Sequence, residues 1–183
     1  MKSIPSYHLK ESFPEPTPDD VENYSKIIEN DSSNAFAYFL RANAFARQKK
    51  YSESIEDLQK VLEIESNNPM AINNLGTAYM ALGKTSQALD HFEIAIQIDP
   101  NYYDAYHNRG LALMDLNKMD QSIKDLSKAI ELKPDFWSAY RHRGIAHHLV
   151  GDEKASYRDY LAAKNTEKPA GSKFDKWELK VFS

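Results

Sequence analysis

Apolar residues in the middle of the chain recur at helical spacing in short runs. Tyr106, Gly110 and Leu113 fall at i, i+4 and i+7, and the stretch from Ile123 to Ile130 places apolar residues at i, i+3, i+6 and i+7. A helix turns once in about 3.6 residues, so each run puts its apolar side chains on one face. The pattern predicts two amphipathic helices, joined by the short polar turn at residues 116–120, that form a hairpin.

The hairpin pattern returns at a constant period of about 34 residues, a length typical of repeat architectures. Gly76, Gly110 and Gly144 are equally spaced along the chain, and Ala42 holds the same place one period earlier. The period predicts four consecutive helical hairpins with no insertion between them: 35–68, 69–102, 103–136 and 137–170.

The small residues at the repeated positions have a packing reason. We expect Gly110, in the first helix of its hairpin, to face Ser122 and Ala129 in the second helix. Only small side chains would let the two backbones approach at such a place. Each hairpin alone would leave an apolar face in water, so successive hairpins must stack to bury it.

The segments that flank the hairpins depart from the pattern. Residues 1–18 contain four prolines among polar residues and predict an irregular, acidic leader. Residues 19–34 predict an N-terminal capping helix, because apolar residues recur at helical spacing from Val21 to Ile28. Capping segments with a polar outer face are what a stacked array needs for solubility.

Residues 171–183 follow the last hairpin and hold Phe174, Trp177 and Val181 at i, i+3 and i+7. This spacing predicts a C-terminal capping helix or tail, with Trp177 buried against the last hairpin. Two other places for the tail stay open at this point, one in the groove of the array and one on another chain.

The repeated residues resemble the tetratricopeptide repeat (TPR) family. The segments 71–76 (AINNLG) and 105–110 (AYHNRG), each followed by the second-helix pattern and an Asp–Pro or Lys–Pro, match its motif closely. The resemblance covers about three quarters of the chain. It implies an all-α fold, a right-handed α-solenoid of antiparallel helix pairs whose first helices line a concave groove.

Composition excludes several classes of function. The chain has 23 Lys and Arg against 27 Asp and Glu, a net charge of −4, so no global basic field attracts nucleic acid. It has no cysteine, which rules out disulfides, Cys–zinc sites and thiol nucleophiles. No apolar run approaches the roughly 18 residues of a membrane span. The first residues lack the apolar core of a secretory signal, so we expect a cytoplasmic protein with no membrane partner.

Motifs for catalysis and metal binding are weak. Gly83–Lys84–Thr85 resembles the end of a phosphate-binding loop, but that motif needs glycine where the chain has Ala78. His107 and His142 are expected on the inner face of neighbouring hairpins, where they would titrate near about pH 6.5, but they make a poor metal site by themselves. Hydrolase templates are absent from the sequence. We therefore expect a non-enzyme that needs no cofactor and no metal.

One pair of positions varies together along the repeats. Arginine at 41, 109 and 143 is followed at a constant distance by aspartate at 57, 125 and 159. The hairpin that lacks the arginine, with Leu75, also lacks the aspartate and has His91 instead. This correlation predicts an ion pair between the two helices of a hairpin rather than a ligand site.

A second stripe on the first helices is the candidate binding surface, because it carries amides, imidazoles, hydroxyls and scattered apolar residues rather than lysine and glutamate. An Asn amide offers both a donor and an acceptor, which suits a peptide backbone. The candidate peptide-binding residues are Asn43, Asn73, Asn74, Thr77, Asp104, His107, Asn108, Leu111, Arg141, His142 and Ile145.

Asn74 and Asn108 stand at equivalent positions and resemble the asparagine ladder of peptide-binding TPR proteins, so we expect both to hydrogen-bond an extended peptide backbone. The carboxylate clamp of chaperone adaptors fits less well, because Phe39, Asp104 and Asn108 occupy the places of its cations. The sequence thus predicts a protein-interaction module or scaffold that binds a peptide or partner segment in its groove. The alternative is a structural assembly subunit, a homo-oligomer for example, that docks through the aromatic tail.

Overall fold

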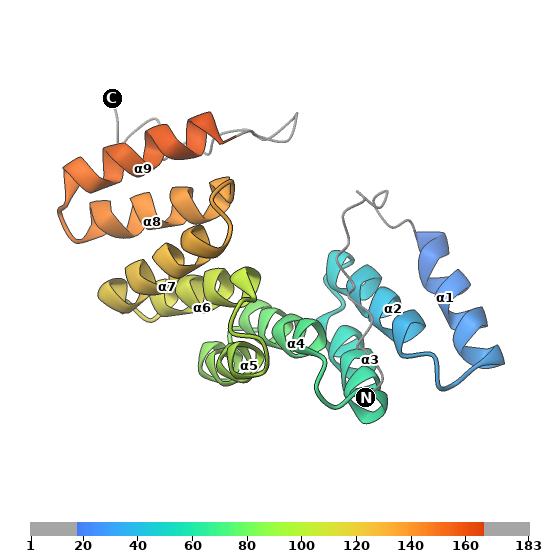
Figure 1. Ribbon diagram of the computed structural model, residues 1–183. Helices are drawn as coiled ribbons and strands as arrows, with labels where there is room; N and C mark the ends of the chain where they lie inside the picture. The colour runs from blue at the N-terminus through green and yellow to red at the C-terminus, as the bar shows by residue number, and fades with distance from the viewer. Residues whose placement is uncertain (1–17, 167–183) are drawn as a thin grey trace. The chain divides into compact units, whose positions relative to one another are not determined.

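The computed structural model describes residues 18–166, and these residues fold into nine α-helices without a β-strand (Figure 1). Most of the predicted leader lies outside the described residues. The predicted tail, with Phe174, Trp177 and Val181, lies entirely outside them. Within the part of the chain described, no helix is long and apolar enough to cross a membrane.

The described helices belong to two compact units, which divide after Ser66. The first unit holds α1 (Pro18–Asn30), α2 (Ala35–Arg47) and α3 (Tyr51–Ile64). The second unit holds α4 (Pro69–Ala81), α5 (Thr85–Ile98), α6 (Tyr103–Asp115), α7 (Met119–Leu132), α8 (Trp137–Leu149) and α9 (Glu153–Asn165). The first helices α2, α4, α6 and α8 begin at equal intervals along the chain, in step with the sequence pattern.

Local sequence explains where several helices begin. The side chains of Asn34, Asn68 and Asp152 each accept a hydrogen bond, of 2.9 to 3.0 Å, from the backbone N–H three residues later. These caps satisfy an N–H group that the first turn of a helix leaves without a partner. Pro69 adds to the start of α4, because proline has no N–H to lose at the first helical position.

The turns inside the hairpins share one backbone conformation. Lys49, Gly83, Asn117 and Gly151 stand at equivalent positions of successive repeats, just after a first helix, and their φ angles are 60°, 73°, 57° and 83°. A residue with positive φ ends a helix by letting the following N–H groups bond back to its last carbonyls. Lys84 N, for example, donates to the carbonyl of Tyr79 over 2.9 Å.

The core of the second unit lies between successive hairpins. Phe92 of α5 packs with Ala112 of α6, and half-buried Tyr79 and Met80 of α4 cover the same cluster. A second cluster joins α7 to Ala139 of α8. Stacking thus buries the apolar faces as expected within this unit.

The glycine column packs differently from the sequence-based expectation. A Cβ atom on Gly110 would lie 2.9 Å from Cγ of Leu126, and one on Gly76 would lie 2.5 Å from Cε1 of Phe92. Gly110 approaches Ser122 through the backbone carbonyl of that serine, and Ala129 is not among its nearest neighbours. Glycine therefore makes room for a large side chain in the second helix. The prediction that Gly110 faces the small side chains of the second helix was wrong.

Candidate functional site

The candidate residues of the second unit lie on three first helices. Asn73, Asn74 and Thr77 belong to α4; Asp104, His107, Asn108 and Leu111 to α6; Arg141, His142 and Ile145 to α8. Asn43 belongs to α2 in the other unit and is described apart from them. We call the face of α4, α6 and α8 that carries Asn73, His107 and His142 the first-helix face.

Amide side chains link α4 to α6 on this face. Asn108 Nδ2 donates a hydrogen bond of 3.0 Å to Asn73 Oδ1, and Asn73 Nδ2 donates one of 3.3 Å to Asn74 Oδ1. Asn73 is buried, with 4% of its surface exposed, whereas Asn74 and Asn108 are half-buried. The amides therefore form a chain that runs from a buried position to the surface.

Imidazoles link α6 to α8. Nε2 of His107 lies 3.1 Å from Nδ1 of His142, and the hydroxyl of Ser138 lies 3.2 and 3.4 Å from the same two atoms. Nδ1 of His107 lies 3.3 Å from Oδ1 of Asn108. Because Asn108 uses its Nδ2 to donate to Asn73, its Oδ1 accepts from the His107 Nδ1–H. Nε2 of His107 is then the acceptor for α8.

The hydrogen bonds thus run in one direction across three helices. His142 or Ser138 donates to His107, His107 donates to Asn108, Asn108 to Asn73, and Asn73 to Asn74. Each of these bonds restricts the orientation of the side chains that it joins. The network therefore favours one direction for the half-buried amides of this face.

Both histidines are neutral near pH 7. Burial lowers the pKa of His107 from 6.5 to about 4. Burial, and then the neighbouring charges of His107 and Arg141, lower the pKa of His142 to about 4. The expectation that they titrate near pH 6.5 was wrong, because the sequence does not reveal how far the imidazoles are withdrawn from water.

The charged candidates lie beside this network. Burial raises the pKa of Asp104, while the nearby Lys133 and a hydrogen bond with Tyr103 act in the opposite direction. Lys133 also lies over the ring of Tyr103 at 4.5 Å and donates to its hydroxyl at 3.2 Å. Asp104 is thus a half-buried carboxyl within an aromatic and cationic corner of α6.

The accessible part of the face mixes amides with apolar side chains. Thr77 is exposed, while Leu111 and Ile145 are half-buried. Asn108 uses one N–H and one oxygen lone pair in its bonds to described residues, and an amide carries two of each. One donor and one acceptor of Asn108 can thus serve a ligand, while Asn73 and His107 hold the amide from behind.

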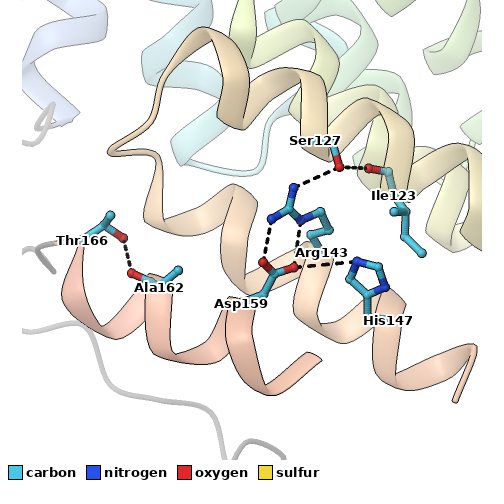
Figure 2. Close-up of polar contacts among 7 residues, drawn as sticks. All are labelled: Ile123, Ser127, Arg143, His147, Asp159, Ala162 and Thr166. Atoms are coloured by element: carbon cyan, nitrogen blue, oxygen red, sulfur yellow. Dashed lines mark hydrogen bonds and ion pairs between the residues drawn. The ribbon is translucent and has the colours of Figure 1, made fainter. Parts of the chain in front are cut away.

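The Arg–Asp correlation is confirmed as a set of ion pairs between the two helices of a hairpin. Each arginine bonds both carboxylate oxygens of its aspartate through Nε and Nη2, at 2.8 and 2.8 Å for Arg41–Asp57, 2.7 and 2.8 Å for Arg109–Asp125, and 2.8 and 2.6 Å for Arg143–Asp159. Figure 2 shows the last pair, where Nη1 of Arg143 also donates to the hydroxyl of Ser127 in α7 over 3.0 Å.

Sequence reasoning missed this third bond of the arginine. Arg41 donates to Ser25 at 2.9 Å, and Arg109 bonds Glu93, in each case to the residue 16 positions earlier. One guanidinium therefore ties its own hairpin to the preceding second helix. The sequence contains the information needed to predict this bond, because each arginine has a polar residue 16 positions earlier: Ser25, Glu93 or Ser127.

Groups that could bind a metal ion do not converge on the described first-helix face. Among the described residues, no cluster of three or more histidines and carboxylates is placed to hold a metal ion. His147 and His148 are each paired with an acidic residue instead, His147 with Asp159 at 4.0 Å and His148 with Glu153 at 2.9 Å. The first-helix face offers hydrogen-bonding groups and apolar side chains.

Family models agree with this architecture. A model described as TPR repeat matches residues 42–83 and 76–117, and one described as tetratricopeptide repeat matches residues 103–136. The chain belongs to the tetratricopeptide repeat family, and its fold class is an all-α TPR solenoid. No curated protein matches the chain.

Solved structures show the same fold. MamA (residues 41 to the end) from Desulfovibrio magneticus RS-1 aligns with a TM-score of 0.69 and 20% identity over 83% of this chain and 86% of that one. YrrB, a TPR protein with an unusual peptide-binding site, aligns with a TM-score of 0.64 and 22% identity over 81% and 79%. The first TPR of Spaghetti (RPAP3), bound to the HSP90 peptide SRMEEVD, aligns with a TM-score of 0.61 and 28% identity over 66% and 95%.

Proposed function

We propose that this chain is a protein-interaction module that binds an extended peptide segment along the first-helix face, and that it acts by binding rather than by catalysis. The observation that carries the proposal is the directed network of amides and imidazoles across α4, α6 and α8. YrrB and RPAP3, which share the fold, are described as peptide-binding and peptide-bound.

The network supports binding of a backbone rather than of one particular side chain. Half-buried amides held in one direction match the alternating N–H and C=O groups of an extended chain. Because their orientation is already fixed, little conformational entropy is lost when a ligand arrives. Backbone recognition of this kind carries little sequence information.

Selectivity then comes from the neighbours of the amides. Among the candidate residues, Leu111 on α6 and Ile145 on α8 are half-buried and apolar. Asp104 and Arg141 bring one negative and one positive charge to the face. We infer a ligand whose apolar side chains contact Leu111 and Ile145.

The ligand differs in kind from the acidic peptide bound to RPAP3. A clamp for a terminal carboxylate needs cations where this chain has Phe39, Asp104 and Asn108. Asp104 would repel a carboxylate, and desolvating a carboxylate beside it would cost further free energy. An internal, neutral segment suits the face better.

The test begins with peptides selected from a random displayed library on the full chain. The affinity of a selected peptide is then measured by calorimetry for the wild type and for Leu111→Ser with Ile145→Ser. Loss of two apolar contacts should weaken binding roughly ten- to a hundredfold. Ile94→Ser is the matched control, because Ile94 is a 43% exposed apolar residue on the second helix α5.

Circular dichroism should show the same helix content in all three proteins. If the double variant binds as tightly as the wild type, or if Ile94→Ser weakens binding equally, the first-helix face is not the binding surface. Asn108→Ala is a poorer probe, because it also removes the partner of Asn73 and His107.

A further inference from the structure

The division between the two compact units coincides with a change in the repeat. The units divide after Ser66, so the next helices along the chain, α4 and α5, begin the second unit. Their hairpin is also the one that lacks the arginine of the repeat, since it has Leu75 in that place and His91 in the place of the aspartate. The boundary of the units and the missing side chain therefore fall at the same step between hairpins.

Within each unit, the arginine links a hairpin to the second helix before it. Nε and Nη2 of the guanidinium bond the aspartate of the same hairpin, as Figure 2 shows for Arg143 and Asp159. The third nitrogen, Nη1, bonds the residue 16 positions earlier, in Ser25–Arg41 at 2.9 Å, Glu93–Arg109, and Ser127–Arg143 at 3.0 Å. Hydrogen bonds from a charged group are stronger than neutral ones, so these bonds couple successive hairpins.

At the step from the first unit to the second, the sequence lacks the groups for this link. The three corresponding positions hold Gln59, Leu75 and His91. The leucine side chain has no hydrogen-bonding group and cannot join the other two. His91 instead stacks on Tyr79 of its own hairpin, with the ring centroids 5.1 Å apart and the planes 1° from parallel. The second hairpin thus has a contact between its own two helices where the other hairpins have a link to the helix before them.

We propose that the chain folds as two cooperative units that divide after Ser66, because the arginine that links successive hairpins is missing at position 75. The stability of a repeat array is approximately the sum of a contribution from each repeat and one from each interface between neighbours. Where an interface contributes little, the parts on its two sides open and close separately. This proposal is independent of peptide binding on the first-helix face.

The first unit should be the one that unfolds first. It has three described helices against six in the second unit, and a smaller unit buries a smaller fraction of its surface. Hydrogen exchange of backbone amides, measured by mass spectrometry on the full chain at increasing urea concentration, tests this order. In the wild type, the amides of α1–α3 should lose their protection at a lower urea concentration than those of α4–α9.

Installing the missing link should couple the two units. Gln59→Ser with Leu75→Arg and His91→Asp supplies the three residue types that are joined in the last link. Since one bond to a charged group is gained, protection of α1–α3 should rise about tenfold or more, and both groups of amides should lose protection together. Leu75→Arg alone lacks the aspartate and should raise the protection less than the triple variant does.

The reverse exchange should create a second division. Glu93→Gln with Arg109→Leu and Asp125→His gives the next step the residue types of the boundary, so α4 and α5 should lose protection before α6–α9. The control is Lys128→Gln, which breaks an exposed ion pair of 2.7 Å with Glu131 on α7 and should leave α4–α9 as one unit.

Three results would overturn the proposal. In the first, all described helices of the wild type lose protection at one urea concentration. In the second, the variant with the installed link keeps the wild-type helix content by circular dichroism and still shows two separate groups of amides. In the third, the reverse variant leaves α4–α9 as one unit, or divides it no more than Lys128→Gln does. The reverse variant decides the matter if the installed link prevents folding.

Discussion

Single residues set the distance between the helices of a hairpin. Gly76 faces the fully buried ring of Phe92, and Gly110 faces Leu126. The equivalent positions in the first unit hold Ala42 and Leu58. The repeat period located the glycines, but which side chain they accommodate depends on the rotation of one helix against the other. That rotation is set by packing and is absent from the spacing of residues along the chain.

Gly76→Ala should therefore destabilise the chain. Its Cβ would lie 2.5 Å from the Phe92 ring, and overpacking of this kind costs about 1–3 kcal/mol. The better helix propensity of alanine returns up to about 1 kcal/mol. Urea unfolding followed by circular dichroism measures the net loss.

The double variant Gly76→Ala with Phe92→Leu provides the control, because it recreates the pair Ala42–Leu58. In the Phe92→Leu background, Gly76→Ala should cost less than in the wild type. An equal cost in both backgrounds would mean that the phenylalanine ring is not what the glycine accommodates.

The buried histidines make stability depend on pH. The pKa of both His107 and His142 is about 4 in the folded chain and about 6.5 in the unfolded chain, so the unfolded chain binds more protons between these values. The contribution of the two neutral histidines to stability is fully present above about pH 6.5 and is lost as the pH falls towards about 4. For two such groups the slope approaches about 2.7 kcal/mol per pH unit.

Urea unfolding at a series of pH values between about 7.5 and 5 tests this effect. His107→Asn with His142→Asn should flatten the slope, because asparagine takes up no proton in this pH range. The raised pKa of Asp104 acts in the opposite sense and is common to all these proteins, so slopes are compared between variants. A double variant with the wild-type slope would refute the assignment.

At the scale of elements, the residues in the turns after the first helices differ in how well they tolerate a positive φ angle. Gly83 and Gly151 adopt positive φ without steric cost, while Lys49 at 60° and Asn117 at 57° carry a Cβ in the left-handed region. Gly83 is recognisable in the sequence as a residue suited to a helix end. Lys49 is not, since only the register of the repeats reveals that lysine stands in the same place.

Lys49→Gly should stabilise the chain by about 0.5–1 kcal/mol, because the relief of steric strain exceeds the entropy that glycine loses on folding. Gly83→Ala should destabilise it by a similar amount, because alanine is disfavoured at positive φ. Thermal unfolding of both variants checks the pair of signs. Two changes of the same sign would contradict this account of the turns.

Helix positions were more predictable from sequence than the site. Apolar periodicity and capping residues such as Asn68 act within a few residues, so the chain displays them directly. The burial of Asn73 and the contact of His107 with His142 arise only when helices of successive repeats are stacked. Sequence reasoning found these residues but treated them as one open surface, although Asn73 and His107 lie behind it.

At the scale of the whole molecule, the repeat brings side chains from three helices of the second unit into one hydrogen-bonded face. Each hairpin contributes two polar residues to it, and the Arg–Asp pairs join the two helices of a hairpin elsewhere. The ion pairs and the first-helix face use different columns of the repeat. The ion pairs can thus be changed by mutation without altering the residues of the first-helix face, which makes the proposed function testable.

Nuclear magnetic resonance of the side-chain amides tests the central claim most directly. In the ¹⁵N-labelled full chain titrated with a library-selected peptide, the NH₂ resonances of Asn74 and Asn108 should shift in proportion to the bound fraction. Those of Asn30, which donates to the carbonyl of Lys26 on α1, and of Asn101, before α6, should stay in place. Saturable binding that leaves Asn74 and Asn108 unmoved would contradict recognition by the first-helix face.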